Sequence, residues 1–350
     1  MIDQPAQPRT GEELDKEALS SYLRSRGAVT GEIFIQQFPS GYSNLTYLIQ
    51  SGNLEFVLRR PPVGATIKSA HDMTHEFHVL TSLRQAGYDK SPEPVLLCED
   101  ESVIGAKFYL MGRVNGIILR NRVPNELKIE ASSFHALSKS ALDQLVHLHQ
   151  LELRTSPLDQ LGKPEGYVQR QVEGWTKRYE NSATDEIDSL NETANWMKKN
   201  LPVTSSVAFI HNDFKYDNLV LNPNSLTQVL AVLDWEMATV GDPLMDLGTT
   251  LAYWAEANDS DALKPFNLTW MPGNLTRQEV LDYYQEKSGN AIDNIIFYYA
   301  FGSFKVAVIC QQIYSRYKKG ITQDPRFASL IHVIKACGEN ARRAITNLKI

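Results

Sequence analysis

The sequence predicts an α+β protein of two lobes, in which a small antiparallel sheet precedes a larger, mostly helical lobe. Two observations lead to this prediction. Alternating apolar and polar residues, typical of half-buried strands, fill much of the first third of the chain, and apolar residues at helical spacing fill most of the remainder. We place the first lobe at 1–112 and the second at 113–350. A ligand would by default bind between two such lobes.

The first lobe is predicted to contain a five-stranded sheet and one helix. Strands are expected at 32–38, 45–50, 54–60, 94–98 and 107–111. Turn-forming residues in PSGYSN and SGN separate the first three strands, which therefore form an antiparallel meander. Apolar residues at helical spacing predict a helix at 69–86, which Gly87 would end. The segment GRVNG after the last strand reads as a linker.

The second lobe is predicted to be helical apart from a strand-and-loop region at 207–236. The clearest helices are expected at 133–149, 168–181 and 185–200, and the chain from 243 onwards is again mostly helical. The most apolar long stretch, 295–314, contains Gly302, Lys305 and Gln311, which is too polar for a membrane span. A buried helix is expected there instead.

Composition excludes several classes of function. The 350 residues are 43% hydrophobic and 22% charged, an ordinary globular mixture, and the net charge of −6 argues against nucleic-acid binding through bulk electrostatics. The cysteines Cys98, Cys310 and Cys337 lack the spacing of a disulfide framework or a zinc site. The N-terminal segment is polar and acidic, unlike a signal peptide. We therefore expect a cytoplasmic protein that contacts neither nucleic acid nor membrane.

The segment FIHNDFKYDNLVL at 209–221 concentrates polar residues between two apolar flanks. His211, Asp213 and Asn218 would lie on a loop held at both ends, and an apolar strand at 230–236 ends in Asp-Trp-Glu. Mg²⁺ prefers oxygen ligands, so one carboxylate from Asp234, one amide oxygen from Asn218 and nucleotide phosphates would suit it. Asp213 would then be left to accept the proton of a substrate hydroxyl.

These motifs resemble the aminoglycoside phosphotransferase and choline kinase family, over about residues 30–320. HNDFKYDN is similar to the catalytic loop of that family, LDWE to its metal-binding strand end, and GDPLMDLG to the segment that follows. FPSGYSNLTYLI, FVLRRPP and GYVQRQVEGW look most like the kinase-like N-terminal domain of some acyl-CoA dehydrogenases. The resemblance implies a bilobal protein-kinase-like fold and transfer of the γ-phosphoryl group of ATP to a small-molecule hydroxyl.

The resemblance also implies roles for residues in the second lobe. Asp213 would be the catalytic base, and Asn218 and Asp234 would hold Mg²⁺. His211 would hold the loop in place, and Lys215 would neutralise charge on the transferring group. Asp242 and Asp246 are interpreted as structural, with Asp246 bonding to the catalytic loop and Asp242 holding the turn before Pro243.

In the first lobe, the resemblance implies a nucleotide site. Met111, Gly112 and Val114 would form the hinge that meets adenine. Ser40, Gly41, Ser43 and Asn44 would form the turn that covers the phosphates.

One position departs from the family pattern. A lysine is usual on the third strand, whereas period-two alternation here places Val57 and Arg59 on one face, so that Arg59 is the expected phosphate cation with Glu76 as its partner. Arginine is larger and planar, so this exchange is not conservative. It leaves open a second interpretation, a pseudokinase-like nucleotide-binding module with little transferase activity. A protein kinase is less favoured because GDPLMDLG follows LDWE too soon for a long activation segment.

The acceptor is expected to be anionic or partly apolar. The segment 297–320 combines aromatic residues with Lys305, Arg316, Lys318 and Lys319, whereas an aminoglycoside pocket is usually acidic. Similarity to the dehydrogenase-linked domain favours a hydroxylated acyl-CoA-like or other phosphorylated metabolite. The protein is expected to act as a monomer or homodimer.

Overall fold

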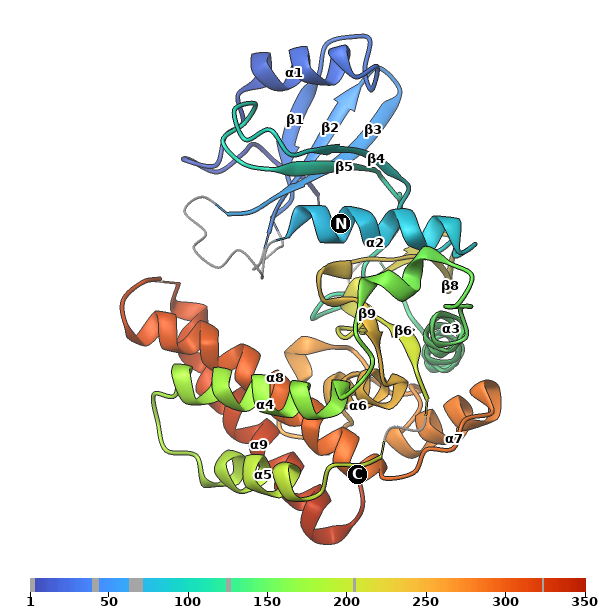
Figure 1. Cartoon of the computed structure of the whole chain (residues 1–350), viewed down its shortest axis with the longest axis vertical. Helices are drawn as coiled ribbons and strands as arrows, with labels where there is room; N and C mark the ends of the chain where they lie inside the picture. Colours follow the sequence, from blue (N-terminus) through green and yellow to red (C-terminus); the bar gives the residue numbers. More distant parts are fainter. Residues whose placement is uncertain (1–3, 40–43, 63–71, 124–126, 204–205, 323) are drawn as a thin grey trace.

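The computed structural model describes residues 4–39, 44–62, 72–123, 127–203, 206–322 and 324–350. The chain forms two lobes (Figure 1), a smaller one built on a sheet and a larger one built on helices. This confirms the predicted protein-kinase-like α+β architecture.

The smaller lobe contains the five predicted strands. They are β1 (Phe34–Gln37), β2 (Leu45–Ser51), β3 (Leu54–Arg60), β4 (Pro94–Cys98) and β5 (Phe108–Gly112). Every neighbouring pair is antiparallel, in the order β1-β2-β3-β5-β4. The predicted helix is α2 (Met73–Gln85), whose first turn is capped by the side chain of Asp72. The start predicted at 69 lies outside the described residues.

A second helix, α1 (Lys16–Ser25), was not predicted. Leu19 and Leu23 of α1 are fully buried in a small core with Leu58, Phe108 and Leu110 of the sheet. The sequence did carry a local signal, because Asp15 caps the helix and Leu19, Tyr22 and Leu23 lie at helical spacing, but the segment is only ten residues long and was overlooked.

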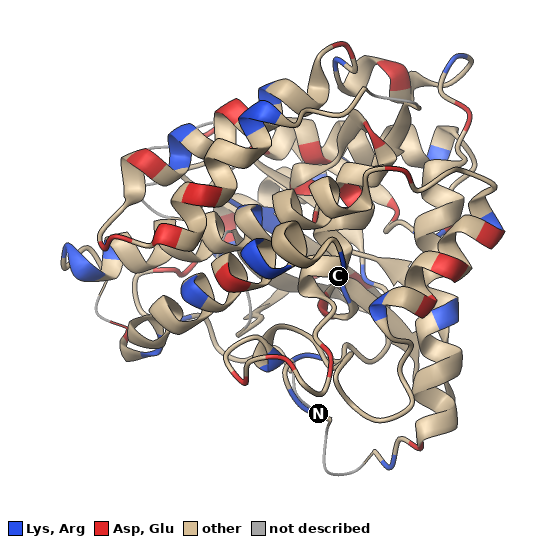
Figure 2. Ribbon diagram, turned by 90° about the horizontal axis from the view of Figure 1, so that it is seen from below, with Lys and Arg blue, Asp and Glu red and all other residues tan. Residues whose placement is uncertain are grey.

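The larger lobe is built from seven helices among the described residues. They are α3 (Ala131–His149), α4 (Tyr167–Ser182), α5 (Asp188–Lys199), α6 (Pro243–Tyr253), α7 (Arg277–Ser288), α8 (Ile295–Lys318) and α9 (Leu330–Asn347). The three helices expected between 133 and 200 are confirmed, with ends shifted by a few residues. Seen from below (Figure 2), the helices of the larger lobe carry interspersed acidic and basic residues.

Helix α8 is the centre of the larger lobe. Contrary to our expectation, it is long and apolar enough by composition to cross a membrane, but 78% of its most apolar window is buried inside the protein, as predicted for a core helix. Helices α6, α4 and α9 pack against it. Gly248 and Gly302 permit a close approach of α6 to α8, because a Cβ at Gly248 would lie 2.2 Å from the carbonyl oxygen of Tyr298.

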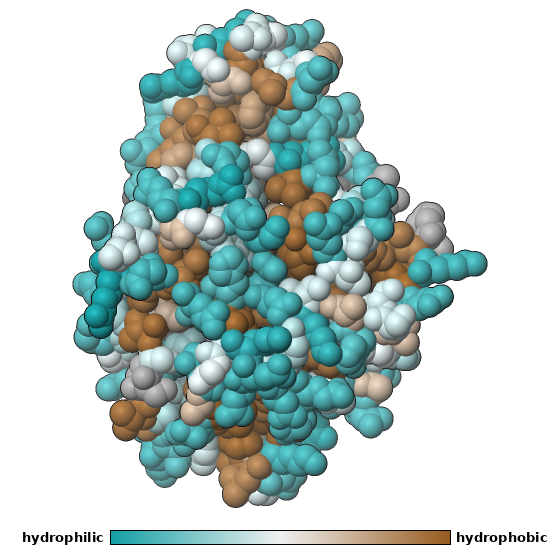
Figure 3. Space-filling model, turned by 90° about the vertical axis from the view of Figure 1, so that its right-hand side faces the viewer, coloured by the Kyte–Doolittle hydropathy of each residue, from teal (hydrophilic) through white to brown (hydrophobic). Residues whose placement is uncertain are grey.

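The face of the molecule on the right-hand side of Figure 1 is shown in Figure 3. It is mostly hydrophilic, with separate apolar patches. Figure 3 also shows the smaller lobe as the narrower upper part of the molecule. This is the distribution expected when the apolar helix faces are turned inward.

Two short two-stranded sheets position the polar loop. They pair β6 (Ala208–Ile210) with β9 (Thr239–Gly241), and β7 (Leu219–Asn222) with β8 (Ser225–Val232). The strand expected at 230–236 therefore starts and ends earlier, and a 3₁₀ turn, η4 (Trp235–Met237), follows it. Helix α2 contacts β4 and β5 on one side and η4 on the other, so it joins the two lobes.

Candidate active site

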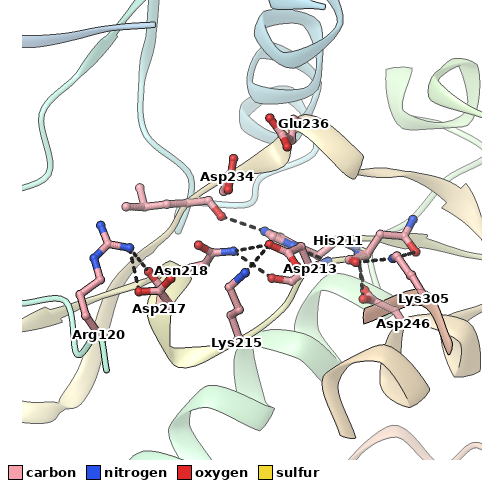
Figure 4. Close-up of polar contacts among 12 residues, drawn as sticks. Arg120, His211, Asp213, Lys215, Asp217, Asn218, Asp234, Glu236, Asp246 and Lys305 are labelled. Carbon is pink, nitrogen blue, oxygen red and sulfur yellow. Dashed lines mark hydrogen bonds and ion pairs between the residues drawn. The ribbon is translucent and has the colours of Figure 1, made fainter. Parts of the chain in front are cut away.

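The loop 211–218 connects β6 to β7 and is anchored by buried aromatic residues. Phe214 and Tyr216 are each 2% exposed, and the hydroxyl of Tyr216 donates to Oδ1 of Asn274 at 2.8 Å. Asp213 and Lys215, which alternate with these anchors, direct their side chains to the polar side of the loop (Figure 4). The alternation of apolar and polar residues in DFKY therefore fixes which groups face a ligand.

Asp246, in the first turn of α6, holds the start of the loop. Its carboxylate accepts from the backbone N–H of His211 at 2.6 Å and from that of Asn212 at 2.8 Å. Burial by itself raises the pKa of Asp246, but hydrogen bonding to His149 and the nearby histidines outweigh it and keep the pKa below its usual range. The structural role predicted for Asp246 is confirmed. Asp242 is likewise structural, capping α6 through the N–H of Leu244 at 2.9 Å.

His211 is buried and neutral, and it holds the loop in place through hydrogen bonds. Burial lowers its pKa, and its Nε2 lies 2.9 Å from the carbonyl oxygen of Leu233. Its Nδ1 accepts from the backbone N–H of Asp213 at 3.2 Å. A carbonyl only accepts and an N–H only donates, so the proton is on Nε2. His211 thus fixes the backbone of Asp213, as predicted.

Asp213, Lys215 and Asn218 form a compact group at the centre of Figure 4. Oδ2 of Asp213 accepts from Nζ of Lys215 at 2.7 Å and from Nδ2 of Asn218 at 3.1 Å. Burial lowers the pKa of Lys215, but Asp213 and Asp217 outweigh that effect and raise the pKa, so Lys215 remains a cation. Its ammonium also lies 4.7 Å from the ring centre of Tyr253. The structure thus brings together three of the predicted site residues.

Asp234 lies just beyond β8, above this group in Figure 4. Its backbone is left-handed, with φ of +68°, a conformation that is uncommon for a residue other than glycine. Burial raises the pKa of Asp234, but Arg59 and Lys215 outweigh burial and lower it. A negative side chain is therefore held at the end of this strand, facing both lobes.

Arg59 links the two lobes through carboxylates. Its Nη1 lies 2.8 Å from Oε1 of Glu76, and both Nη1 and Nη2 lie 3.1 Å from Oδ1 of Asp234. Nη2 is also 3.7 Å from Oε2 of Glu236. The predicted contact between Arg59 and Glu76 is confirmed, and its part in binding phosphate remains a prediction.

The described residues include only part of the predicted nucleotide site. Val57 and Met111 face each other across β3 and β5, and the hinge begins at the end of β5. The N–H of Gly112 already donates to the carbonyl oxygen of Glu93 at 2.8 Å, so it is not available to an adenine base in this conformation. Val114, two residues further on, is partly buried.

The predicted phosphate-covering turn lies mostly outside the described residues. Ser40, Gly41 and Ser43 belong to that part of the chain, whereas Asn44 is described. Asn44 is 3% exposed and donates from Nδ2 to Oε2 of Glu236 at 3.0 Å. The base of the turn is therefore tied to the strand end that carries Asp234.

Sequence reasoning missed three contributors to the site. Glu236 stands in the LDWE motif but was given no role. Arg120, from the linker region, donates to the Oδ1 of Asp217 at 2.8 Å and to its carbonyl oxygen at 3.0 Å. Lys305, expected to face an acceptor, is instead buried beneath the catalytic loop. The apolar surroundings of Lys305 in the sequence were the available signal that it is buried.

The donor set fits a magnesium ion that is shared with phosphates. The described residues contain no cluster of three or more His, Cys, Asp or Glu side chains that could enclose a metal. Asp234 and Asn218 would supply two oxygen atoms, which matches the way Mg²⁺ is held when a substrate completes its shell. Among the described residues, Arg59 Nε is buried without a hydrogen-bond partner.

The two lobes and the H-x-D-x-x-x-x-N loop opposite Asp234 are features of the protein-kinase-like fold class. The chain belongs to the phosphotransferase enzyme family, which matches residues 35–277. In structure, it is similar to a Ralstonia eutropha protein named as an aminoglycoside phosphotransferase, at 27% identity over 96% of this chain and 99% of that one, with a TM-score of 0.80. The GDP and kanamycin complex of APH(2")-IIIa, at 15% identity, shares the fold with a TM-score of 0.64 over 93% of this chain and 99% of that one.

In sequence, the chain is similar to parts of longer proteins. It is 37% identical to acyl-CoA dehydrogenase family member 11 of Gallus gallus, over 83% of this chain and 38% of that protein. It is 35% identical to acyl-CoA dehydrogenase family member 10 of Mus musculus, over 87% of this chain and 28% of that protein. The chain thus spans less than half the length of these relatives. These findings confirm the resemblance found in the motifs.

Proposed function

We propose that this protein transfers the γ-phosphoryl group of ATP to a hydroxyl of a small molecule, with Mg²⁺. The observation that carries the proposal is the placement of Asp213 among Lys215 and Asn218, with Asp234 held opposite by Arg59. A base, a cation and two oxygen ligands are the groups that phosphoryl transfer requires.

Each residue has a role in the proposed reaction. Asp213 orients the acceptor hydroxyl and takes up its proton, and His211 keeps the Asp213 backbone in place. Lys215, which remains charged beside Asp213, offsets the negative charge that develops on the transferring group. Arg59, oriented by Glu76, holds the nucleotide phosphates. Mg²⁺, when bound with the nucleotide at Asn218 and Asp234, supplies additional positive charge.

We further propose an anionic acceptor, such as a hydroxylated acyl-CoA-like metabolite. Support comes from the names of the relatives, which are acyl-CoA dehydrogenase family members, and from Arg316, Lys318 and Lys319, which are exposed near the end of α8. Lys305 cannot contribute to this surface because it is buried. The three buried, unpaired cysteines fit a cytoplasmic protein, and we propose that it works there as a monomer or homodimer.

The proposal is tested by incubating the protein with γ-labelled ATP, Mg²⁺ and a metabolite extract, alongside Asp213→Asn. The wild type should yield a labelled small molecule that mass spectrometry identifies. Asp213→Asn should lower its formation by at least about a thousandfold while Mg-ATP still binds, because the amide cannot accept the proton. Equal turnover by the variant would remove Asp213 from the mechanism. Nucleotide binding without transfer to any acceptor would favour the pseudokinase-like alternative.

A further inference from the structure

Lys305, in the middle of α8, is a buried lysine that the proposed chemistry does not use. Its side chain is 1% exposed, although lysine is almost never fully buried unless it is paired. Its Nζ donates to the carbonyl oxygen of Asn212 at 2.5 Å and lies 5.7 Å from the ring centre of Trp175. Lys305 also lies outside the 35–277 segment that matches the family. The family match therefore assigns it no role.

Asn212, the partner of Lys305, has a left-handed backbone with φ of +67°. Its N–H is bound by Asp246, and its Nδ2 donates to the hydroxyl of Tyr167 at 3.0 Å and to the carbonyl oxygen of Met237 at 3.1 Å. The carbonyl oxygen of Asn212 is the remaining polar backbone group of this residue, and Lys305 binds it. A conformation that an ordinary residue rarely adopts is thus held by contacts from several elements.

The peptide between Asn212 and Asp213 is bound at both ends. Lys305 donates to its carbonyl oxygen, and its N–H donates to Nδ1 of His211 at 3.2 Å. These two bonds fix the plane of the peptide and hence the direction in which the Asp213 side chain leaves the backbone. Figure 4 shows Lys305 beside Asp246, on the other side of Asp213 from Lys215.

We propose that Lys305 is a positioning residue of the phosphotransfer site, which fixes the peptide before Asp213 and places a positive charge behind its carboxylate. The catalytic consequence rests on the proposed function, whereas the structural consequence does not. A small displacement of Asp213 would misalign the acceptor hydroxyl, and such misplacement costs rate without weakening nucleotide binding.

The protonation of Lys305 links this role to pH. Burial lowers its pKa to about 8; Asp213 and Asp246 oppose that shift, and Lys215 and Arg178 add to it. These groups lie on the catalytic loop, on α6 and on α4, which surround the ammonium. Above about pH 8 the side chain loses its proton, so the charge behind Asp213 disappears and the bond to Asn212 weakens.

Hydrogen exchange tests the structural part without any activity. Lys305→Met should speed exchange of peptides from the catalytic loop at least tenfold at pH 7, after correction for intrinsic rates. Lys287→Met is the matched control, because Lys287 also lies over an aromatic ring, Tyr283, but on the surface. Unchanged protection in a folded Lys305→Met variant would overturn the proposal.

Lys305→Arg keeps the inference testable if the methionine variant does not fold. Arginine stays charged at every pH of the experiment, so this variant should keep its loop protection between pH 7 and pH 9, whereas the wild type should lose it. The same pH response in both proteins would overturn the proposal.

Activity is measured as phosphate release from Mg-ATP, with water as the acceptor. Lys305→Met should lower kcat at least tenfold with little change in KM for ATP, and the wild-type kcat should fall above about pH 8. The fall should move to higher pH in Lys305→Arg. An unshifted profile, or a kcat within twofold of wild type in Lys305→Met, would overturn the positioning role. If the wild type transfers phosphate to neither water nor any metabolite, the proposed function fails, and hydrogen exchange still decides whether Lys305 orders the loop.

Discussion

The buried ion pair between Arg59 and Glu76 makes a quantitative prediction about stability. The two side chains are 10% and 1% exposed, and their charged atoms lie 2.8 Å apart. Glu76→Ala would leave the Arg59 guanidinium buried with one strong partner fewer. Removing one member of a buried pair typically costs about 3–5 kcal/mol. Asp234 and Glu236 remain at 3.1 Å and 3.7 Å from the same guanidinium, so we expect the lower end, about 3 kcal/mol.

A surface pair in the same lobe provides the matched control. Arg84 and Glu93 lie 2.5 Å apart, but their side chains are 38% and 59% exposed. Water and salt screen such a pair, so Glu93→Ala should cost no more than about 1 kcal/mol.

The assay is urea denaturation of wild type, Glu76→Ala, Arg59→Ala and the double variant. The double variant should be destabilised by about 2 kcal/mol less than the sum of the single variants, because the second substitution removes the charge that the first left unpaired. Additive effects, or a cost for Glu76→Ala no larger than for Glu93→Ala, would refute the reasoning.

Three further substitutions test the packing and the loop. Gly248→Ala should destabilise the protein by about 3 kcal/mol, since its Cβ would lie 2.2 Å from a backbone oxygen. Gly174→Ala should instead stabilise α4 by about 0.5–1 kcal/mol, because the new Cβ meets only the flexible end of Arg178 at 3.3 Å. Urea denaturation in which both substitutions change the free energy of unfolding in the same direction would contradict this. Because burial lowers the pKa of His211, the unfolded chain binds its proton more readily, and stability should fall as the pH drops below about 6.5. His211→Asn should reduce that slope in pH-dependent denaturation, and an unchanged slope would show that His211 does not contribute to it.

The lobe architecture was predictable because strand and helix periodicities are local. The five strands, α2 and the buried helix α8 were all expected within a few residues of their observed bounds. The helix α1 was missed although Asp15 and the spacing of Leu19, Tyr22 and Leu23 were local signals for it. The strand before Asp234 was expected to run through Glu236, but β8 ends at Val232, two residues before the left-handed backbone at Asp234.

The sequence predicted the motif of the candidate site, but not the contacts that its residues make with distant segments of the chain. The spacing of His211, Asp213 and Asn218, together with Asp234, already indicated phosphoryl transfer, since the required groups lie within one short region of sequence. The pairing of Arg59 with Glu76 was implied by the family resemblance, and strand alternation selected Arg59 as the cation. The loop motif is local in sequence, so its spacing can be recognised without the tertiary structure.

The tertiary structure alone decided how charges from distant segments meet. The sequence could not show that Arg59 also reaches Asp234, that Asn44 binds Glu236, or that Lys305 lies beneath Asn212 instead of facing an acceptor. In each case the partners are more than ninety residues apart, and no local pattern encodes their distance. Burial strengthens these charged contacts and shifts their pKa values, so the electrostatics of this site is a property of the packed lobes and not of any one motif.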